Sequence, residues 1–473
     1  MIALFIFLHV YFVSFTDKPE KTAPQLSPRA VEQRAKWNIA TDGMDYPVSG
    51  MYLNKVREAG GKVHHVSRWF NGATVEMDAK TAEKVAALKC VTAVEMTREA
   101  GKKSSSVPRK KRMREQIAYE QALSTDAQLA TYNLLPLHDA GYEGQGILMA
   151  ICDGGFYNAN TLSCFRQKEL DLGHFDFTDE DSLGYDFYGS TGEHGTRCLS
   201  VISGIRDDYY CSAAKAQYYL MRSEEEETES PKEMDNLVAA LEKADSLGVN
   251  VFSVSLGYSS FDKDAWDLPK SALDGKSTRV SLAATIAARK GMLVCVAAGN
   301  EGNDEYWRTI SAPADADSIL TIGAVDTNRE IGSFSSWGPS ADGRIKPEVC
   351  AVGVKTTLIK SNGEIIRGNG TSYATPLLAG MAATLWSALP NENAMQIRER
   401  IIRSSDRYTN PDTKQYGYGI PDAWKAYQMS IPTGIENTEY KIQNTDSRKI
   451  LRNGQILIQR GNKTYTLTGQ RAE

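Results

Sequence analysis

Hydrophobic and polar positions alternate between strand and helix patterns from about residue 118 to residue 430. Nearly continuous apolar runs, which are typical of strands buried on both faces, occur at 146–155, 216–222, 249–257, 291–300 and 318–325. Stretches with the helical period lie between them, most clearly at 234–248 and 281–291. This order predicts an α/β fold with a mostly parallel sheet of the doubly wound kind. Sites in such sheets form at the carboxyl ends of the strands.

Residues 25–100 show a different and shorter pattern. Helical character at 27–37 and 49–61 is followed by two strand patterns within 62–78, around a turn at Asn71 and Gly72. An amphipathic helix at 79–90 and a strand at 91–96 complete the region. The repeated order of helix and strand predicts a small α+β unit of the split βαβ kind.

The N-terminus, MIALFIFLHVYFVSF, is almost entirely apolar, and the sequence turns polar at Thr16. This run is too short to span a bilayer comfortably and has the length of a signal-peptide core. Residues 1–17 are therefore predicted to be a signal peptide, although a basic segment before the run and a clear cleavage site are absent. The alternative is a buried N-terminal helix or strand. No other stretch approaches the length of a membrane span, so none is expected in the mature protein.

Two segments are predicted to connect or follow the folded units. Residues 102–114 carry seven basic residues and no acid, and an exposed linker is favoured over a nucleic-acid contact because no aromatic residues interleave with the charges. Residues 453–470 alternate apolar and polar positions around a turn at 460–462, which predicts a short β-hairpin. The hairpin's role, as a sorting module, a structural cap or a tail, stays open. The expected organisation is a signal peptide, an N-terminal unit with its basic linker, an α/β domain, and a linker with a hairpin, at 1–17, 18–117, 118–430 and 431–473.

Composition and charge narrow the classes of function. The net charge of −5 over 473 residues argues against general nucleic-acid binding, which requires a basic face. The seven cysteines are scattered, which excludes a zinc ribbon and gives no disulfide framework. Cys152 and Cys295 lie in apolar strand patterns, as buried small hydrophobes do. A disulfide between Cys164 and Cys211 stays open.

Three polar residues stand where strands end or helices begin, and together they can make an activated nucleophile. Asp153 ends the run LMAICD, His194 opens the helix pattern of HGTRCLSVISG, and Ser372 opens that of SYATPLLAG. A serine hydroxyl needs a base to take its proton before it attacks a carbonyl at neutral pH. Histidine can do this, while a carboxylate fixes its tautomer and stabilises the imidazolium. Each residue alone is more often structural, but the order Asp, His, Ser is one of the three known orders of this triad.

These motifs resemble those of the subtilisin-like serine peptidases, the subtilases. CDGGF resembles the family's Asp motif, HGTRCLSVISG its His motif and GNGTSYATPLLAG its Ser motif, while VAAGNEGN and FSSWGPSADGRIKPEV resemble two further segments. The resemblance covers residues 118–430 and implies a three-layer fold with a mostly parallel seven-stranded sheet and helices on both faces. Two departures are Gly154, where many members have Thr or Ser, and CSAAK at 211–215, where Gly-x-Ala-Pro is usual.

The resemblance also assigns residues around the serine. Asn300, which alone would be interpreted as a turn residue, corresponds to the side-chain donor of an oxyanion hole whose second donor is the backbone N–H of Ser372. The helix at Ser372 would direct its positive end at that oxyanion, and Gly368 and Gly370 are expected to permit a tight turn before it. The implied walls of the primary specificity pocket are small, which predicts an open slot for a large hydrophobic or aromatic side chain. The substrate-binding residues would be Ser253, Ser255, Leu256, Gly257, Ala297, Ala298 and Gly299.

An acidic segment lies near this expected pocket. Seven acids fall between Glu224 and Asp235, in the part of the sequence that borders more distant subsites in the family. Three interpretations stay open: a solvated loop, a subsite that prefers basic residues, or a carboxylate cluster for Ca²⁺. The chemistry itself needs no cofactor. Some subtilases bind structural calcium, but no metal ligand is assigned here.

The sequence thus predicts a secreted serine endopeptidase that is made as a zymogen. The N-terminal unit resembles the family's inhibitory propeptide by position and pattern, and its removal is expected to follow cleavage between Gly101 and Tyr119. The expected partners are protein or peptide substrates and the chain's own propeptide, at a secreted or cell-surface location. The alternative is a surface binding or adhesion protein that keeps the subtilase scaffold with little turnover.

Overall fold

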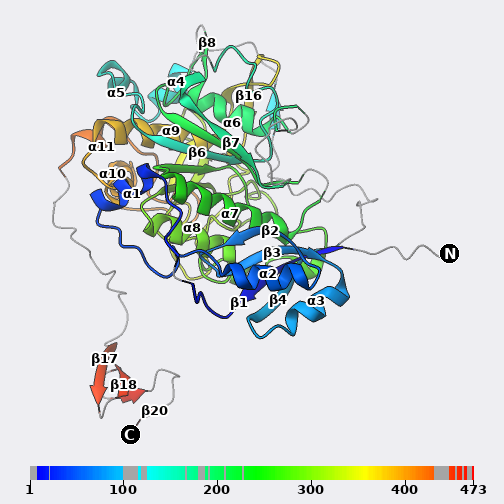
Figure 1. Ribbon diagram of the computed structural model, residues 1–473. Coiled ribbons are helices and arrows are strands. Elements are labelled where there is room, and N and C mark those ends of the chain that lie inside the picture. The colour runs from blue at the N-terminus through cyan, green and yellow to red at the C-terminus, as the bar shows by residue number, and fades with distance from the viewer. Residues whose placement is uncertain are drawn as a thin grey trace. The chain divides into compact units, whose positions relative to one another are not determined.

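The structure is a computed structural model, and it describes most of the chain. The described residues are 8–20, 22–99, 116–118, 125–165, 168–178, 187–189, 192–206, 209–225 and 228–430, with 447–452, 455–460, 463–465 and 471–472. The chain divides into two compact units, Met1–Met429 and Ser430–Glu473. Within the first unit we distinguish an N-terminal subdomain (residues 8–99) from a main subdomain (residues 116–430), drawn from blue to orange in Figure 1.

A seven-stranded parallel sheet forms the centre of the main subdomain, which confirms the predicted α/β fold. The strands lie in the order β14-β13-β12-β11-β6-β10-β7. Since β10 and β7 lie on one side of β6 and the later strands on the other, the topological switch point lies beside β6, where sites of such sheets form. The bounds are β6 (Leu148–Asp153), β7 (Asp171–Asp176), β10 (Gln217–Arg222), β11 (Val251–Val254), β12 (Leu293–Ala297), β13 (Leu320–Val325) and β14 (Val349–Val352).

Helices cover both faces of this sheet because its strands are apolar on both faces. Met149 and Ile151 of β6 face the core formed with α6 and α9, whereas Leu148 and Ala150 face the core formed with α7 and α8. The alternation follows the period of two of a β-strand. The long helices are α6 (His194–Ser203), α7 (Pro231–Leu247), α8 (Arg279–Arg289) and α9 (Thr371–Ala388).

Shorter elements surround the layers. The helices are α4 (Asp126–Ala130), α5 (Leu135–Asp139), α10 (Ala394–Ser404) and α11 (Ala423–Gln428), with 3-10 turns η1 (Lys168–Leu170), η2 (Asp264–Trp266) and η3 (Lys270–Ala272). The strands are β5 (Gln116–Ala118), β8 (Ile205–Arg206), β9 (Tyr209–Tyr210), β15 (Thr356–Ile359) and β16 (Ile365–Asn369). No helix in the described part of the chain is long and apolar enough to cross a membrane.

The N-terminal subdomain is built on a four-stranded sheet; the split βαβ pattern predicted its helices and three of its strands, but not β1. The strand order is β2-β3-β1-β4, with antiparallel neighbours. Figure 1 shows this blue subdomain beside the green helices α7 and α8, and α7 contacts β1, β2 and β4. The bounds are β1 (His9–Phe15), α2 (Gly50–Glu58), β2 (Lys62–Ser67), β3 (Gly72–Met77), α3 (Ala79–Ala86) and β4 (Val91–Arg98).

Strand β1 corrects the predicted signal peptide at residues 1–17. It pairs with β3 on one side and with β4 on the other, so it is a central strand of the sheet. Tyr11 and Val13 pack in the subdomain's own core, while the ring of Phe12 on the other face lies under the Arg279 guanidinium, 4.1 Å away. The alternative of a buried N-terminal strand is therefore the correct one for residues 9–15. A strand buried on both faces has the same apolar run as a leader, which explains the error.

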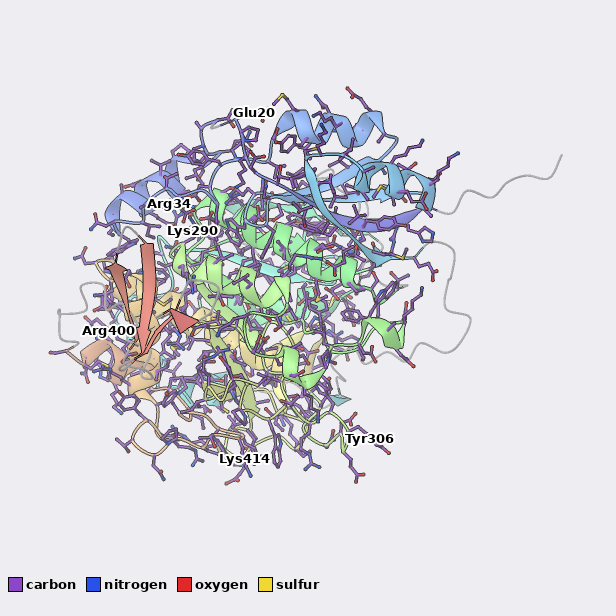
Figure 2. The ribbon with its side chains drawn as sticks, turned by 90° about the horizontal axis from the view of Figure 1, so that it is seen from below. Glu20, Arg34, Lys290, Tyr306, Arg400 and Lys414 are labelled. Carbon is purple, nitrogen blue, oxygen red and sulfur yellow. The ribbon has the colours of Figure 1, made fainter. Side chains whose placement is uncertain are left out.

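An extended arm, residues 22–49, connects β1 with α2 and crosses to the far end of α7. Its helix α1 (Pro28–Lys36) starts where α7 ends: Ser27 donates its N–H to the carbonyl of Ser246 (2.8 Å) and its hydroxyl to that of Leu247 (3.0 Å). These bonds satisfy carbonyls that a helix end leaves unpaired. Figure 2 shows Arg34 of the arm beside Lys290, the residue after α8.

The C-terminal unit is a separate antiparallel sheet. Strand β18 (Gln455–Arg460) pairs with β19 (Lys463–Tyr465), which confirms the predicted hairpin. β17 (Ser447–Arg452) pairs with the other side of β18, and β20 (Arg471–Ala472) pairs with β19. The basic segment 102–114 lies outside the described residues.

Candidate active site

Asp153 and His194 are hydrogen-bonding partners at the carboxyl end of the sheet. Asp153 is the fully buried last residue of β6, and His194 is the first residue of α6. His194 Nδ1 lies 2.6 Å from Asp153 Oδ1, which also accepts the N–H of Gly154 at 2.8 Å. A carboxylate so placed keeps the proton on Nδ1 and leaves Nε2 able to accept another.

Close packing explains the glycine after His194. Gly195 donates its N–H to the carbonyl of Gly155 (2.9 Å), and a Cβ atom at position 195 would lie 2.5 Å from that oxygen. Only glycine lets α6 begin so close to the turn after β6. At Gly154 a Cβ atom would lie 3.6 Å from Cβ of Glu224, which is an ordinary contact. Steric crowding therefore does not explain why this chain has Gly154 where many family members have Thr or Ser.

Ser372 lies in the first turn of α9 and is fully buried. Its Oγ is 3.4 Å from the carbonyl oxygen of Ser255, just after β11. Pro376 has no N–H to donate to the Ser372 carbonyl four residues earlier. Ser255 Oγ (2.8 Å) and Cys198 Sγ (3.4 Å) donate to this carbonyl instead. Elements from three parts of the chain therefore hold the residue at this helix start.

The predicted tight turn at Gly368 and Gly370 is wrong. Gly368 lies within strand β16, and Gly370 has an extended backbone with φ of 163°. A Cβ atom at Gly368 would lie 2.6 Å from the ring of Tyr373, so the close approach of this ring, rather than a turn, requires glycine there. Ser372 is presented by a direct passage from strand to helix.

Cys198 shows that α6 brings His194 next to Ser372. Its Sγ lies 3.8 Å from His194 Nδ1 and 3.4 Å from the carbonyl oxygen of Ser372. The rings of His194 and Tyr373 also approach, with centroids 5.9 Å apart. The structure thus collects the predicted Asp153, His194 and Ser372 in one place. Burial raises the pKa of Cys198 to about 11, so this thiol stays protonated near neutrality and is a poor nucleophile.

A second buried serine of α6, Ser200, serves the fold. Its Oγ donates to the carbonyl of Arg197 (2.7 Å) and accepts the N–H of Ile359 (3.0 Å). It also contacts the hydroxyl of Tyr209 at 3.1 Å. These partners tie α6 to β15 and occupy the hydroxyl. Ser372 remains the better candidate for a nucleophile.

Asn300, three residues after β12, is held by Thr371. Its Oδ1 accepts hydrogen bonds from the backbone N–H (2.8 Å) and the hydroxyl (2.9 Å) of Thr371, which fixes the orientation of the amide. Nδ2 is buried and has no hydrogen-bond partner among the residues described. A Cβ atom at Gly370 would lie 3.6 Å from it. Unsatisfied buried donors are rare, and this one is directed to the start of α9, where an oxygen of a bound molecule can satisfy it.

The residues predicted to bind substrate differ in exposure. Ser253 and Ala297 lie inside β11 and β12 and are buried, as are Ser255, Ala298 and Gly299. Leu256 and Gly257 are partly exposed and follow Ser255 directly. Of the expected pocket walls, these two residues therefore present accessible surface next to Ser372.

The acidic segment forms a compact cluster rather than a fully solvated loop. Carboxylate oxygens of Glu224, Glu229 and Glu233 lie within 4.8 Å of one another. Burial, together with the charges of Glu224 and Glu229, raises the pKa of Glu233 well above its usual value. Tyr258 donates its hydroxyl to Glu224 at 2.7 Å. Oxygen atoms are the ligands that Ca²⁺ prefers, and a Ca²⁺ site here stays a prediction. Glu226 and Glu227 lie outside the described residues.

Sequence reasoning missed Cys198 and Thr371 as supports of this site. Both lie inside the quoted motifs, Cys198 four residues after His194 and Thr371 directly before Ser372. The spacing of four residues on a helix was the available signal, because it places Cys198 on the same face as His194. The role of Thr371 depends on contact with a residue 71 positions away, which no local pattern shows.

Comparisons with known proteins identify two regions. The profile of the subtilase family matches residues 144–419, and that of the Peptidase S8 propeptide domain of Bacteroidota matches residues 10–114. Subtilisin amylosacchariticus of Bacillus subtilis subsp. amylosacchariticus is 25% identical over 373 residues, 79% of this chain and 85% of that protein. Subtilisin DY of Bacillus licheniformis is 28% identical over 289 residues, 61% of this chain and 93% of that protein. The crystal structure of MycP1 from the ESX-1 type VII secretion system aligns with a TM-score of 0.55 and 20% identity, over 70% of this chain and 94% of that one, and shows the fold alone.

Proposed function

Since the chain belongs to the subtilase family of serine-type endopeptidases, we propose that Ser372 is its nucleophile and His194 its general base. The observation that carries the proposal is the pair between His194 Nδ1 and Asp153 Oδ1 (2.6 Å) next to the buried start of α9. Nε2 accepts the proton of Ser372 Oγ as the hydroxyl attacks a peptide carbonyl, and later gives it to the leaving amine. Asp153 holds the ring and stabilises the imidazolium.

Asn300 is the proposed side-chain donor of the oxyanion hole. The carbonyl oxygen becomes negatively charged as Ser372 attacks, and a donor already oriented toward it stabilises the transition state without reorganisation. Thr371 orients the amide through Oδ1, so Nδ2 is available for this oxygen. The backbone N–H of Ser372 and the positive end of α9 support the same charge. Water then hydrolyses the acyl-enzyme.

The N-terminal subdomain is the proposed inhibitor of a zymogen. Its match to a propeptide domain covers residues 10–114. It packs against α7 and contacts α8 through Arg279. We place the cleavage that separates it between Gly101 and Tyr119, so that the enzyme begins near residue 118 and continues to about residue 430, with the C-terminal unit at 431–473. Substrates are proteins or peptides. Export to the outside of the cell is part of the proposal and is supported by the propeptide match, with no role for residues 9–15 as part of a leader.

Self-processing tests the nucleophile. The wild-type chain is expected to lose its N-terminal subdomain on incubation, while Ser372→Ala keeps it, because no acyl-enzyme can form without the hydroxyl. Intact mass spectrometry after overnight incubation measures both. Ser200→Ala is the matched control: it loses the hydrogen bonds that hold α6 to β15 but keeps the nucleophile, so it should still process. Processing by Ser372→Ala at the wild-type rate would refute the assignment.

A fluorophosphonate probe separates the proposed enzyme from a binding or adhesion protein on the same scaffold. Only an activated serine reacts covalently with the probe, so the wild-type chain cleaved by trypsin in the 102–114 segment should be labelled at Ser372. Asn300→Ala should keep the labelled serine but lower kcat by about 10²–10³-fold, a magnitude known for this donor in subtilisin. Asn303→Ala, an exposed change in the same turn, is the control. A chain that is never labelled would favour the adhesion alternative.

A further inference from the structure

Two ion pairs join the last described residues of the N-terminal subdomain to the main subdomain. Arg98, which ends β4, donates from Nη1 to the two carboxylate oxygens of Glu225 at 3.0 and 2.8 Å. The next residue, Glu99, pairs with Lys263. Successive residues of an extended chain point to opposite sides. Arg98 and Glu99 therefore meet two different segments of the main subdomain, and each meets the opposite charge.

Both segments begin beside proposed catalytic residues. Ser223, two residues before Glu225, donates its N–H to the carbonyl of Asp153 (3.2 Å). The segment that carries Lys263 starts at Ser255, whose carbonyl is 3.4 Å from Ser372 Oγ. We infer that a peptide that continues from Glu99 toward Ser372 runs between these two segments.

Hydrogen bonds fix the two segments to each other. Asp262 donates its N–H to the carbonyl of Glu229 (2.9 Å), and Glu229 donates its N–H to the carboxylate of Asp262 (3.0 Å). Tyr258 adds the bond to Glu224. Glu225 and Lys263 are therefore held at a defined spacing, independent of the N-terminal subdomain.

Glu225 is preorganised as an acceptor. Its carboxylate accepts hydrogen bonds from Lys232 Nζ (2.5 Å) and Thr228 Oγ1 (2.8 Å). Although burial opposes ionisation, Lys232 and Arg98 lower the pKa of Glu225 to about 2, so the group is charged at neutral pH. Lys263 is held in turn, with Nζ 4.9 Å from the centroid of the Trp266 ring. Both charges belong to the main subdomain and remain when the N-terminal subdomain leaves.

We propose that Glu225 and Lys263 form a charge-selective subsite that binds a basic residue followed directly by an acidic residue, upstream of the bond that is cut. Arg98 and Glu99 occupy this subsite in the zymogen. The inference rests on the proposed protease function and defines part of its substrate preference. A substrate with the reversed order would place an acid beside Glu225 and a base beside Lys263, and such like charges repel.

The test compares three fluorogenic peptides on the mature enzyme. They share one sequence around the scissile bond and differ at two adjacent upstream positions, which hold Arg-Glu, Gln-Gln or Glu-Arg. In further sets of peptides, the pair is placed one residue further from the scissile bond each time. At one spacing, kcat/KM for Arg-Glu should exceed that for Glu-Arg by about 10-fold, because two partly exposed pairs contribute and the reversal adds repulsion. The Gln-Gln peptide should lie between them.

A charge-reversed enzyme provides the second measurement. The double variant Glu225→Lys with Lys263→Glu should prefer Glu-Arg over Arg-Glu. Glu330→Lys with Lys414→Glu makes the same change at exposed positions outside both segments and should keep the wild-type order. If the charge-reversed chain does not fold, the three peptides on the wild-type enzyme still decide.

The outcomes separate the inference from the proposed function. Ser372-dependent hydrolysis of the Gln-Gln peptide supports the protease whatever the charges do. If Arg-Glu and Glu-Arg then differ by less than twofold at every spacing, the subsite is refuted and the protease stands. If no peptide is hydrolysed by an enzyme that also resists the fluorophosphonate probe, both proposals fall.

Discussion

Arg34 and Arg98 both reach from the N-terminal subdomain to carboxylates of the main subdomain, but one pair is buried and the other lies near the surface. Arg34 Nη2 lies 2.8 Å from Asp245 and 2.9 Å from Asp45, in a group whose side chains are at most 6% exposed. The side chain of Arg98, facing Glu225, is 28% exposed. The arm therefore holds the far end of α7 with desolvated charges, and β4 holds the side near the active site with charges that water still reaches.

The difference decides what each contact can do. A buried ion pair is weak evidence for net stability, but removal of one partner leaves an uncompensated charge and is strongly destabilising. A pair near the surface contributes little and is screened by salt, so a substrate can replace it. The buried group is suited to retaining the propeptide, and the exposed pairs are suited to being exchanged for a substrate.

Arg34→Ala should have the largest effect on retention of the propeptide. It removes the cation that Asp45 and Asp245 share, while Lys290 still pairs with Asp45 and Arg68 with Asp245. The lost charged hydrogen bonds cost about 1.5–3 kcal/mol, which corresponds to about 10–10²-fold faster release. The measurement uses the Ser372→Ala chain cleaved in the 102–114 segment, and native mass spectrometry follows dissociation of the propeptide over time.

Arg57→Ala is the matched control for this variant. Arg57 is an exposed residue of α2 that donates to Asn54 of the same helix. It should release the propeptide at the wild-type rate. Equal rates for the Arg34 and Arg57 variants would show that the buried group does not retain the propeptide, and the contrast between the two contact regions would disappear.

The sequence predicted the main sheet and the proposed site because their signals are local. Asp153, His194, Ser372 and Asn300 each lie in a short motif at the end of a strand or the start of a helix, and parallel strands bring such ends to one edge. The role of β1 was not predictable in the same way. A central strand that is buried on both faces has a continuous apolar run, and a signal peptide has the same kind of run.

The contacts of the arm were beyond prediction for a different reason. Arg34 meets Asp245 across 211 positions of the chain. In the sequence it is one of several charged residues of a short amphipathic helix, which favours a solvated face. Trp69 is similar: it lies in the predicted hairpin, yet its ring is buried in the core of the main subdomain with Phe177 and Leu241. The local sequence pattern does not indicate which residues far away in the chain a side chain will contact.

Acid should accelerate release of the propeptide by an amount between those expected for Arg34→Ala and Glu95→Gln. Although burial opposes it, Arg34 and Lys290 lower the pKa of Asp45 from 3.8 to about 2. A lowered pKa in the bound state means that the contribution of Asp45 is fully present above about pH 4 and is lost as the pH falls through about 2. Release should accelerate by on the order of 10-fold between pH 4 and pH 2. The shift of nearly two pKa units corresponds to at most about 10²-fold, and only half of the group is protonated at pH 2.

Asp45→Asn separates this titration from others. The amide cannot ionise, so the variant should release the propeptide quickly at pH 5 and should lose most of the acceleration between pH 4 and pH 2. Glu225 keeps a small part of the slope, because its pKa is lowered into the same range. A full acid response in the Asn variant would place the sensitive group elsewhere.

Glu95→Gln should have the smallest effect and thereby tests the other side of the comparison. Glu95 is 61% exposed and lies 2.7 Å from Arg279 Nη1, while Arg279 keeps Asp235 at 3.2 Å as a second partner. An exposed ion pair contributes about 0.2–1 kcal/mol to binding of the propeptide, and here Arg279 still has Asp235 as a partner. Release should therefore be less than about 5-fold faster than in the unchanged chain. The difference should shrink in 1 M salt, where the Debye length falls to about 3 Å. An effect as large as that of Arg34→Ala would mean that exposure does not separate the two regions, and that the side of the propeptide near the active site retains it as firmly as the arm does.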